Sequence, residues 1–296
     1  MFLTDKPTVQ EVAYETYSIN CMGMQSPMLF VGTRRALLVD TGCGNCDLRG
    51  VVRYLTDLPV TVAITHEHAD HTGGIVQFED VYVPEKERMT IQGYTTDFMQ
   101  CFLDFFNHLI EEEPGINGCF RQQARVHSWD RIPELIPYGD GYSWDLGGRR
   151  VTAYHCPVHS KGHMVLVDDL SRILYAGDSI GDGTGPANNP INPPTYVSLE
   201  TEIWALKHVK EHMAEFDRIF TGHNGWGGHL GVSTSIDVGV IDRMLEVGEG
   251  VLRGELEIYL EKDPGNGDRN YARKGNTTLY FFEKFLYDRD VPEEYR

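Results

Sequence analysis

Side chains that commonly bind metal ions are concentrated in one short segment of the sequence. Four of them, His66, His68, Asp70 and His71, follow a run of apolar and β-branched residues at 60–64 that predicts a buried strand. The end of a strand holds side chains on a rigid support, and residues two apart in an extended chain project to the same side. Imidazole and carboxylate ligands at this density suit divalent transition metals, zinc above all. The segment therefore predicts a metal site, and a metal that activates water gives hydrolytic chemistry.

The composition of the whole chain limits the kind of protein that carries this segment. Its 296 residues are 41% hydrophobic and 11% aromatic, which excludes disorder. Length alone suggests about two domains, but layered α/β folds of this size are often single. The net charge of −18 disfavours duplex DNA and anionic membranes as partners, because both require clustered Lys and Arg. We expect one domain over residues 1–296 that acts on a small molecule, with no nucleic-acid or membrane partner.

Targeting signals and cysteine usage indicate where the protein works. No run of about 18 apolar residues is present, so no transmembrane helix is expected, and the first ten residues lack the apolar centre of a signal peptide. The six cysteines are scattered, which suits free thiols in a reducing compartment. We therefore expect a cytoplasmic protein. Cys43 and Cys46 have the spacing of a redox motif without its structural context, and their role, like that of Cys156, stays open.

The residue pattern predicts which elements position the metal site. Short apolar runs between turn-forming residues predict strands at 27–31, 36–40, 60–64, 150–154, 164–167, 172–176, 217–221 and 277–282. Apolar residues at helical spacing predict helices at 47–55, 96–110, 234–251 and after Ser198, which is a suitable N-cap. Strands and then a helix, twice in succession, suggest two sheets covered by helices.

The helix expected at 96–110 carries a face of large apolar side chains. These are Phe98, Phe102, Phe105, Phe106 and Leu109. Packing into the core is the first interpretation of this face. A lid, a pocket wall or a homodimer surface is the second, because an exposed aromatic face marks a binding surface. On the second interpretation, Phe98 and Phe102 line the substrate pocket.

Four further segments accompany the histidine-rich one in chain order, and together they resemble the motifs of the metallo-β-lactamase superfamily. They are Asp40-Thr-Gly42, His155-Cys-Pro-Val-His159-Ser-Lys-Gly-His163, Ala176-Gly-Asp178 and Thr221-Gly-His223. The resemblance covers residues 28–225 and points to the branch of glyoxalase-II-like and lactonase-like hydrolases. It implies an α/β fold, the αββα four-layer sandwich, with two metals at one edge of the sheets. A helical insertion or lid at 90–130 would separate the second and third metal motifs, and tail strands would occupy 255–296.

The resemblance also implies a role for each residue of the site. The first metal would be bound by His66, His68 and His159. The second would be bound by Asp70, His71 and His223, and Asp178 would bridge the two. Asp40 would fix one of the ligands from behind, and His163 would lie beside them.

Two divalent metals, zinc first and iron or manganese as alternatives, would supply the chemistry. Metal binding lowers the pKa of water from 15.7 to about 7, so a hydroxide bridging the metals exists at neutral pH. That hydroxide, oriented by Asp70 as the catalytic residue, would attack a small ester, thioester, lactone or amide. Phosphodiester hydrolysis at the same dinuclear site and a mononuclear-iron persulfide dioxygenase are the alternative functions.

Three departures from the family pattern narrow these expectations. Cys156 and Val158 stand where many members have Thr and Gly. The separation of His71 from His159 is longer than in compact members, which places the insertion there. Asp178 stands where the zinc β-lactamases have Cys, so β-lactam hydrolysis is less expected than another hydrolysis.

Other histidines have spacings that could suggest ligands. His155 and His163 lie four residues on either side of a ligand position, but Pro157 opposes a helix through them. His208 and His212 form an i, i+4 pair on the helix after Ser198, on the side opposite its apolar residues. We expect this pair to face solvent and to bind no metal.

The substrate pocket is expected to be built by loops next to the ligands. The loop after Asp178, rich in Gly and Pro as far as Pro194, follows a ligand directly. Tyr196 lies just beyond that loop, and His229 follows the last ligand motif closely. Together with the aromatic face at 96–110, these two side chains are expected to line the pocket.

Overall fold

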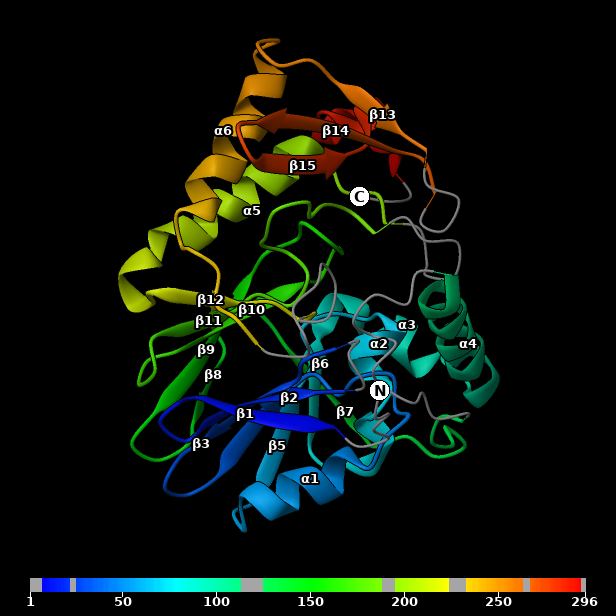
Figure 1. Ribbon diagram of the computed structural model, residues 1–296, viewed down its shortest axis with the longest axis vertical. Coiled ribbons are helices and arrows are strands. Elements are labelled where there is room, and N and C mark those ends of the chain that lie inside the picture. Colours follow the sequence, from blue (N-terminus) through cyan, green and yellow to red (C-terminus); the bar gives the residue numbers. More distant parts are fainter. Residues whose placement is uncertain are drawn as a thin grey trace.

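The computed structural model describes residues 7–21, 25–112, 125–187, 195–223, 233–262 and 267–293. Two β-sheets stack face to face with helices on both outer sides, and a small third sheet lies beyond the upper helices (Figure 1). The predicted αββα sandwich is therefore confirmed. Its layers run from α1 at the bottom of the view to α5 and α6 near the top.

The first sheet has seven strands that follow one another in chain order. They are β1 (Thr8–Ala13), β2 (Thr16–Asn20), β3 (Met28–Val31), β4 (Ala36–Val39), β5 (Val60–Ala63), β6 (Val81–Pro84) and β7 (Leu135–Tyr138). The strands pair antiparallel from β1 to β4 and parallel from β4 to β7. Because β4 and β5 are parallel, their carboxyl ends meet at one edge, where Asp40 and the segment beginning at Thr65 follow them.

The second sheet has five strands in the order β12-β11-β10-β9-β8. Their bounds are β8 (Ser143–Asp145), β9 (Arg150–His155), β10 (Met164–Asp168), β11 (Ile173–Tyr175) and β12 (Arg218–Phe220). The pair β11 and β12 is parallel, while the other pairs are antiparallel. Asp178 and His223 follow the carboxyl ends of this parallel pair, as Asp40 and Thr65 do in the first sheet.

Helices cover the outer face of each sheet. On the side of the first sheet lie α1 (Leu48–Leu55), α2 (Ala69–Thr72), α3 (Arg88–Gln92) and α4 (Thr96–Glu112). On the side of the second sheet lie α5 (Leu199–Glu211) and α6 (Val240–Leu252), and the third sheet, β13 (Tyr259–Glu261), β14 (Arg269–Lys274) and β15 (Thr277–Phe281), packs on α6. Short 3₁₀ turns lie at Ile75–Gln77, Glu85–Glu87, Met213–Glu215, Glu283–Phe285 and Asp288–Asp290.

Strands β3, β4, β10 and β11 are buried on both faces, which explains why they read as continuous apolar runs. In β4, Ala36 and Leu38 pack in the core beneath the first layer of helices, while Leu37 and Val39 pack between the two sheets. All four side chains are fully buried. The alternation of side chains along a strand thus gives each sheet two apolar faces, and three cores separate the four layers.

The helix expected at 234–251 begins later than its sequence suggests. In the structure α6 starts at Val240, because Ile236 is paired with Ile219 of β12 through backbone hydrogen bonds in both directions. A backbone already used in a strand pair cannot begin a helix. By contrast, Ser198 caps α5 as expected, its hydroxyl accepting from the backbone N–H of Thr201 at 3.0 Å.

We expected His208 and His212 to face solvent, but in the structure both pack against neighbouring residues. Helix α5 packs on β9, and the ring of His212 stacks on Tyr154 at 3.7 Å between ring centroids. His208 lies 3.0 Å from a carboxylate oxygen of Asp140. Both rings are half-buried, and neither belongs to a group of candidate metal ligands among the described residues.

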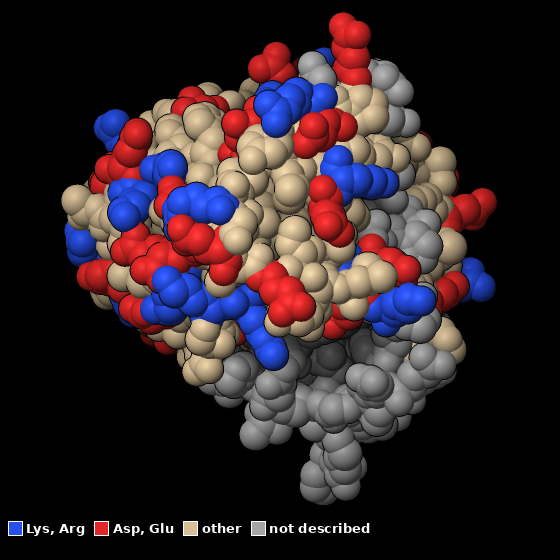
Figure 2. Space-filling model, turned by 90° about the horizontal axis from the view of Figure 1, so that it is seen from above, with Lys and Arg blue, Asp and Glu red and all other residues tan. Residues whose placement is uncertain are grey.

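Charged side chains on the face above α5 and α6 are of both signs (Figure 2). Lysines on α5 pair with acidic residues on α6, at 2.7 Å for Lys207 with Glu249 and 2.6 Å for Lys210 with Asp242. Lys274 of β14 lies 3.0 Å from Glu246. These cations are matched by neighbouring carboxylates and do not gather into a basic patch on this face.

One buried carboxyl makes the stability of the fold depend on pH. Glu202 of α5 is fully buried, neither of its oxygens has a hydrogen-bond partner among the described residues, and burial raises its pKa well above the ordinary value of 4.5. The unfolded chain loses this proton near pH 4.5 and the folded chain keeps it to higher pH. The free energy of unfolding therefore falls as the pH rises above about 4.5.

Replacement of Glu202 with Leu is expected to raise the free energy of unfolding at pH 8 by about 1–3 kcal/mol, the cost of an unsatisfied buried polar group. Denaturant unfolding at pH 5 and pH 8 measures this change. The matched variant Glu202→Gln removes the titration and keeps the polar group, so it should flatten the pH dependence without the full gain. This account would be contradicted if the free energy of unfolding of the wild type rose between pH 5 and pH 8 and that of both variants changed by the same amount.

Candidate metal centre

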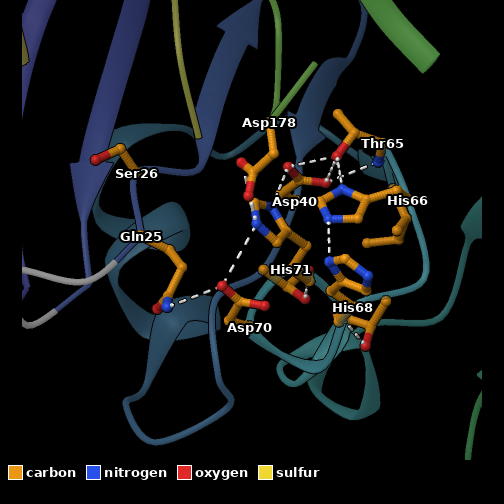
Figure 3. A network of polar contacts seen from close by, with 12 residues as sticks. Gln25, Ser26, Asp40, Thr65, His66, His68, Asp70, His71 and Asp178 are labelled. Atoms are coloured by element: carbon orange, nitrogen blue, oxygen red, sulfur yellow. Dashed lines mark hydrogen bonds and ion pairs between the residues drawn. The ribbon is translucent and has the colours of Figure 1, made fainter. Parts of the chain in front are cut away.

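Seven candidate ligands meet at the edge where the parallel strand pairs of both sheets end. The first sheet supplies His66, His68, Asp70 and His71 from the segment after β5, and the second supplies His159, Asp178 and His223. Figure 3 shows the imidazole and carboxylate groups of the first segment turned toward one another and toward Asp178. Ligands separated by most of the chain therefore lie within one site.

Three histidines form the first ligand group. His68 Nδ1 lies 2.9 Å from His66 Nε2 and 3.1 Å from His159 Nε2. Burial lowers the pKa of all three side chains, that of His68 to about 3, so each is neutral with a lone pair available. A tetrahedral zinc ion with Zn–N distances of about 2.0–2.1 Å sets its nitrogens roughly 3.3 Å apart. The spacing of these nitrogens fits such an ion.

Asp70, His71 and His223 form a second group beside the first. Asp70 Oδ2 lies 3.6 Å from His71 Nε2 and 3.3 Å from His223 Nε2, and the two histidine nitrogens are 3.3 Å apart. Burial alone would lower the pKa of His223, but Asp178 and Asp70 raise it to about 10. Burial would raise the pKa of Asp70, but His71 and His223 lower it to about 2. The carboxylates and imidazoles of this second group therefore stabilise one another electrostatically.

Asp178 lies between the two groups. Its Oδ2 is 3.1 Å from His223 Nε2 and 3.6 Å from His159 Nε2, and its Oδ1 is 3.4 Å from His71 Nε2. Burial would raise the pKa of Asp178, but His223 and His71 hold it well below 3.8. Asp178 is thus in contact with candidate ligands of both groups.

The charge of the site fits divalent cations. The carboxylates of Asp70 and Asp178 lie beside His71 and His223, and they raise the pKa of both histidines. Metal ions bind the neutral form of imidazole, so a divalent cation would compete with protons for these two side chains. The donor set of five histidines and two carboxylates also matches the preference of zinc and of other first-row divalent metals.

Asp40 holds the candidate ligand His71 from the side opposite the other candidate ligands. Its Oδ2 accepts a hydrogen bond from His71 Nδ1 at 2.8 Å, which leaves His71 Nε2 directed into the site. The same carboxylate accepts from the backbone N–H of Thr65 at 2.7 Å and from the Tyr175 hydroxyl at 3.2 Å. A carboxylate that holds a histidine in this way sets its tautomer and its orientation.

Replacement of Asp40 with Asn is expected to weaken metal binding at the second group by 10–100-fold, the usual cost of losing such an outer partner. An amide offers one acceptor oxygen to His71 and Thr65 together, where the carboxylate offers two. Titration of the metal-free protein with zinc in the presence of a competing chelator measures the effect. Tyr175→Phe removes one donor and leaves the carboxylate, so a loss equal to that of Asp40→Asn would contradict the assignment.

The third motif segment is also held in place from behind. His163 Nε2 accepts from the backbone N–H of Asp178 at 3.1 Å, and its ring stacks on His66 with centroids 4.7 Å apart. Burial lowers the pKa of His163 well below 6.5, so the ring is neutral and can accept this bond. His163 thus lies beside the ligands, as expected. The carboxyl of Glu87 accepts from Ser160 and, at 2.7 Å, from the backbone N–H of Gly162.

Several of these supporting residues were not expected from the sequence. Tyr175 directly precedes the Ala176-Gly-Asp178 motif but was not singled out, and Glu87 lies in a segment without a motif. Their contacts depend on packing between the two sheets and between a helix turn and a loop. Gln25, whose side-chain nitrogen lies 3.5 Å from Asp70 Oδ2, likewise follows no recognisable pattern. Thr65 could have been singled out from the sequence, because it directly precedes the candidate ligand His66.

The structure describes three of the four residues expected to line the substrate pocket, and it places them in different surroundings. Phe102 is only 1% exposed and belongs to the core beneath the first sheet, which favours core packing and opposes a place in the pocket wall. Phe98 is half-buried, packs against the same core and stacks on Tyr94. Tyr196 packs edge-on against Phe285, and His229 lies outside the described residues.

Three cysteines, Cys21, Cys43 and Cys46, are buried free thiols in the core beneath the first sheet. Cys46 Sγ lies 3.9 Å from Cys21 Sγ, so Cys46 contacts a cysteine outside its own motif. Cys156 is also buried and free, and burial raises its pKa to about 12, which keeps it protonated and unreactive.

Comparison with known proteins gives a family match and several relatives. The family model described as the metallo-beta-lactamase superfamily matches residues 22–223. The acyl-coenzyme A thioesterase MBLAC2 of Homo sapiens is 30% identical over 168 residues, covering 52% of this chain and 57% of the relative. An atrochrysone carboxyl ACP thioesterase of Passalora fulva is 26% identical over 163 residues, covering 52% of this chain and 38% of the relative. The chain thus matches about half, or less, of the length of these relatives.

Solved structures share the fold at low sequence identity. The DIM-1 metallo-β-lactamase superposes with a TM-score of 0.54 at 13% identity, covering 84% of this chain and 99% of that one. A metallo-β-lactamase from Pontibacter korlensis gives the same TM-score at 15% identity, with 82% and 99% covered. In the part of the chain that the structure describes, no helix has the length and apolar character needed to span a membrane.

Proposed function

The chain belongs to the metallo-β-lactamase superfamily of hydrolases, and on that premise we propose that it hydrolyses thioesters of small acyl groups with two zinc ions. Two of its relatives are named as thioesterases, one for acyl-coenzyme A and one for an acyl carrier protein. The family's metal dependence is matched by the candidate ligand groups of this chain.

One observation carries the proposal of a dinuclear centre. Asp178 Oδ2 lies within 3.6 Å of His159 Nε2 from the first group and within 3.1 Å of His223 Nε2 from the second. A single carboxylate beside two complete sets of nitrogen and oxygen donors is suited to two cations that act together. A mononuclear centre would use only one of these two sets of candidate ligands.

Each residue has a defined part in the proposed reaction. His66, His68 and His159 would hold the first metal, and Asp70, His71 and His223 the second, with Asp178 shared. When bound, the two metals supply a hydroxide nucleophile at neutral pH and an electrophile for the carbonyl oxygen of the substrate. Asp70, with its pKa held at about 2, stays ionised and can accept a hydrogen bond from the attacking water. Asp40 keeps the proton on His71 Nδ1 throughout.

The chemistry of the leaving group favours a thioester over an amide. A thiol has a pKa of about 8.5, so its thiolate leaves without prior protonation, whereas an amine must receive a proton as it leaves. The two supporting groups Asp40 and His163 accept hydrogen bonds from His71 and from the backbone N–H of Asp178, so neither is assigned the role of a general acid. A substrate that needs no separate general acid suits this arrangement best.

A substrate panel with metal analysis tests the proposed function. Protein purified without added metal is analysed for zinc, iron and manganese, and is assayed with acetyl- to palmitoyl-coenzyme A by release of free thiol. Oxygen esters, lactones, an aryl phosphodiester and glutathione persulfide under oxygen uptake complete the panel. About two zinc per chain and a preference for thioesters are expected. One iron with oxygen uptake, or a preference for the phosphodiester, would overturn the proposal.

A further inference from the structure

The loop that follows Asp178 is paired with the third sheet. The backbone N–H of Gly183 donates to Thr278 O at 2.9 Å, and the N–H of Tyr280 donates to Thr184 O at 3.0 Å. The Asp182 carboxylate accepts from the N–H of Thr278 at 2.6 Å. Residues 182–184 therefore extend the third sheet along β15, and their position is set by that sheet.

The same loop reaches a candidate ligand on its other side. His159 Nδ1 donates to the carbonyl oxygen of Gly185 at 2.9 Å, and the N–H of Ala187 donates to His159 O at 3.0 Å. A carbonyl only accepts, so this bond places the proton of the neutral ring on Nδ1 and leaves the Nε2 lone pair free. His159 Nε2 is the atom that lies 3.1 Å from His68 Nδ1.

The contact between loop and sheet leaves no space for adjustment at Gly185. A Cβ atom at this position would lie 2.3 Å from Tyr280 O and 2.7 Å from Tyr280 Cβ. On β15, Leu279 and Phe281 are buried in the core with α5 and α6, and the Arg269 guanidinium lies 4.1 Å from the centre of the Tyr280 ring. The strand that supports Gly185 is therefore anchored in the molecule.

We propose that the third sheet, β13–β15, is a positioning element for the metal ligand His159, and that Gly185 is the positioning residue through which it acts. The sheet holds the loop, and the carbonyl of Gly185 fixes the tautomer and the direction of the imidazole. This inference rests on the proposed function only in that the group His66, His68 and His159 binds a metal. It predicts that disturbing the contact between this loop and β15 weakens metal binding by His66, His68 and His159 and leaves the other ligand group largely unaffected.

The substitution Gly185→Ala tests the proposal. Its Cβ would clash with Tyr280 and push the backbone of residue 185 away, and with it the carbonyl that accepts from His159 Nδ1. We therefore expect zinc affinity at the first ligand group to fall by about 10–100-fold. Affinity at the Asp70, His71 and His223 group should stay within about threefold. Metal-free protein is titrated with Zn²⁺ against a competing chromophoric chelator, and then with Co²⁺, whose visible spectrum reports the geometry of each site. Gly139→Ala, where a Cβ meets no atom within 4 Å, is the matched control.

A second, milder variant keeps the test decisive if Gly185→Ala does not fold. Asp182→Ala removes only the exposed acceptor of the Thr278 N–H and should weaken the first group about threefold to tenfold, with the thermal midpoint of the metal-free protein unchanged. Wild-type affinity and an unaltered Co²⁺ spectrum in whichever variant folds would overturn the inference alone, as would equal losses at both groups. A wild-type chain that binds no zinc would overturn the proposed function as well, and the two failures are thus distinguishable.

Discussion

Replacing Asp178 with Ala is expected to lower kcat/KM for thioester hydrolysis by more than about 100-fold and to reduce bound zinc from two ions per chain to one or fewer. Loss of an outer partner of a ligand already costs 10–100-fold in metal affinity or activity. Asp178 faces both ligand groups directly, at 3.1 Å from His223 and 3.6 Å from His159. Its removal should therefore cost more than the loss of an outer partner such as Asp40.

The metal-free Asp178→Ala protein provides a readout that does not depend on activity. Asp178 is the main cause of the raised pKa of His223, which is about 10 in its presence, so this pKa should fall in the variant. Titration followed by NMR of the imidazole protons measures it. Asp57→Asn, an exposed aspartate after α1, serves as the control and should change neither metal content nor activity. Two zinc ions and full activity in Asp178→Ala would show that Asp178 does not bridge.

Replacing Arg149 with Met is expected to lower the free energy of unfolding by about 3–5 kcal/mol, the cost of breaking a buried ion pair from one side. Arg149 and Asp168 are both fully buried, and the guanidinium binds the carboxylate through two nitrogens at 3.0 and 2.8 Å. Arg149 also donates to the backbone carbonyls of Glu15 and Val31 at 2.7 and 3.0 Å. It thereby links the first sheet to the second, and the variant leaves a carboxylate buried without its partner.

Denaturant unfolding of four proteins separates the ion pair from the general effect of losing an arginine. Arg149→Met and Asp168→Leu should each be strongly destabilised. The double variant should be more stable than either single one, because it buries no uncompensated charge. The neighbouring Arg150→Met, at an exposed position, should stay within about 0.5 kcal/mol of the wild type. Additive losses in the double variant would mean that the two side chains act independently.

Local patterns were sufficient for the elements and for part of the site. The runs at 36–40 and 60–64 predicted β4 and β5, the face at 96–110 predicted α4, and Ser198 predicted the start of α5. Where tertiary pairing competed, local pattern failed, as at Ile236, whose backbone pairs with β12 instead of starting α6. The sequence likewise did not indicate that Arg149 and Asp168 are both buried, because a charged side chain is buried only where the fold brings an oppositely charged partner to it.

The sequence by itself determined the segment His66 to His71, because residues a few positions apart share one local backbone, and the resemblance of its motifs to the superfamily implied the αββα fold. Only the tertiary structure decided how His159, Asp178 and His223 meet that segment, and which atoms support them. Their meeting depends on parallel strand pairs in two different sheets ending at one edge. The tautomer of His159 depends on the Gly185 carbonyl, and that of His71 on Asp40. These contacts join residues far apart in the chain, and no spacing in the sequence encodes them.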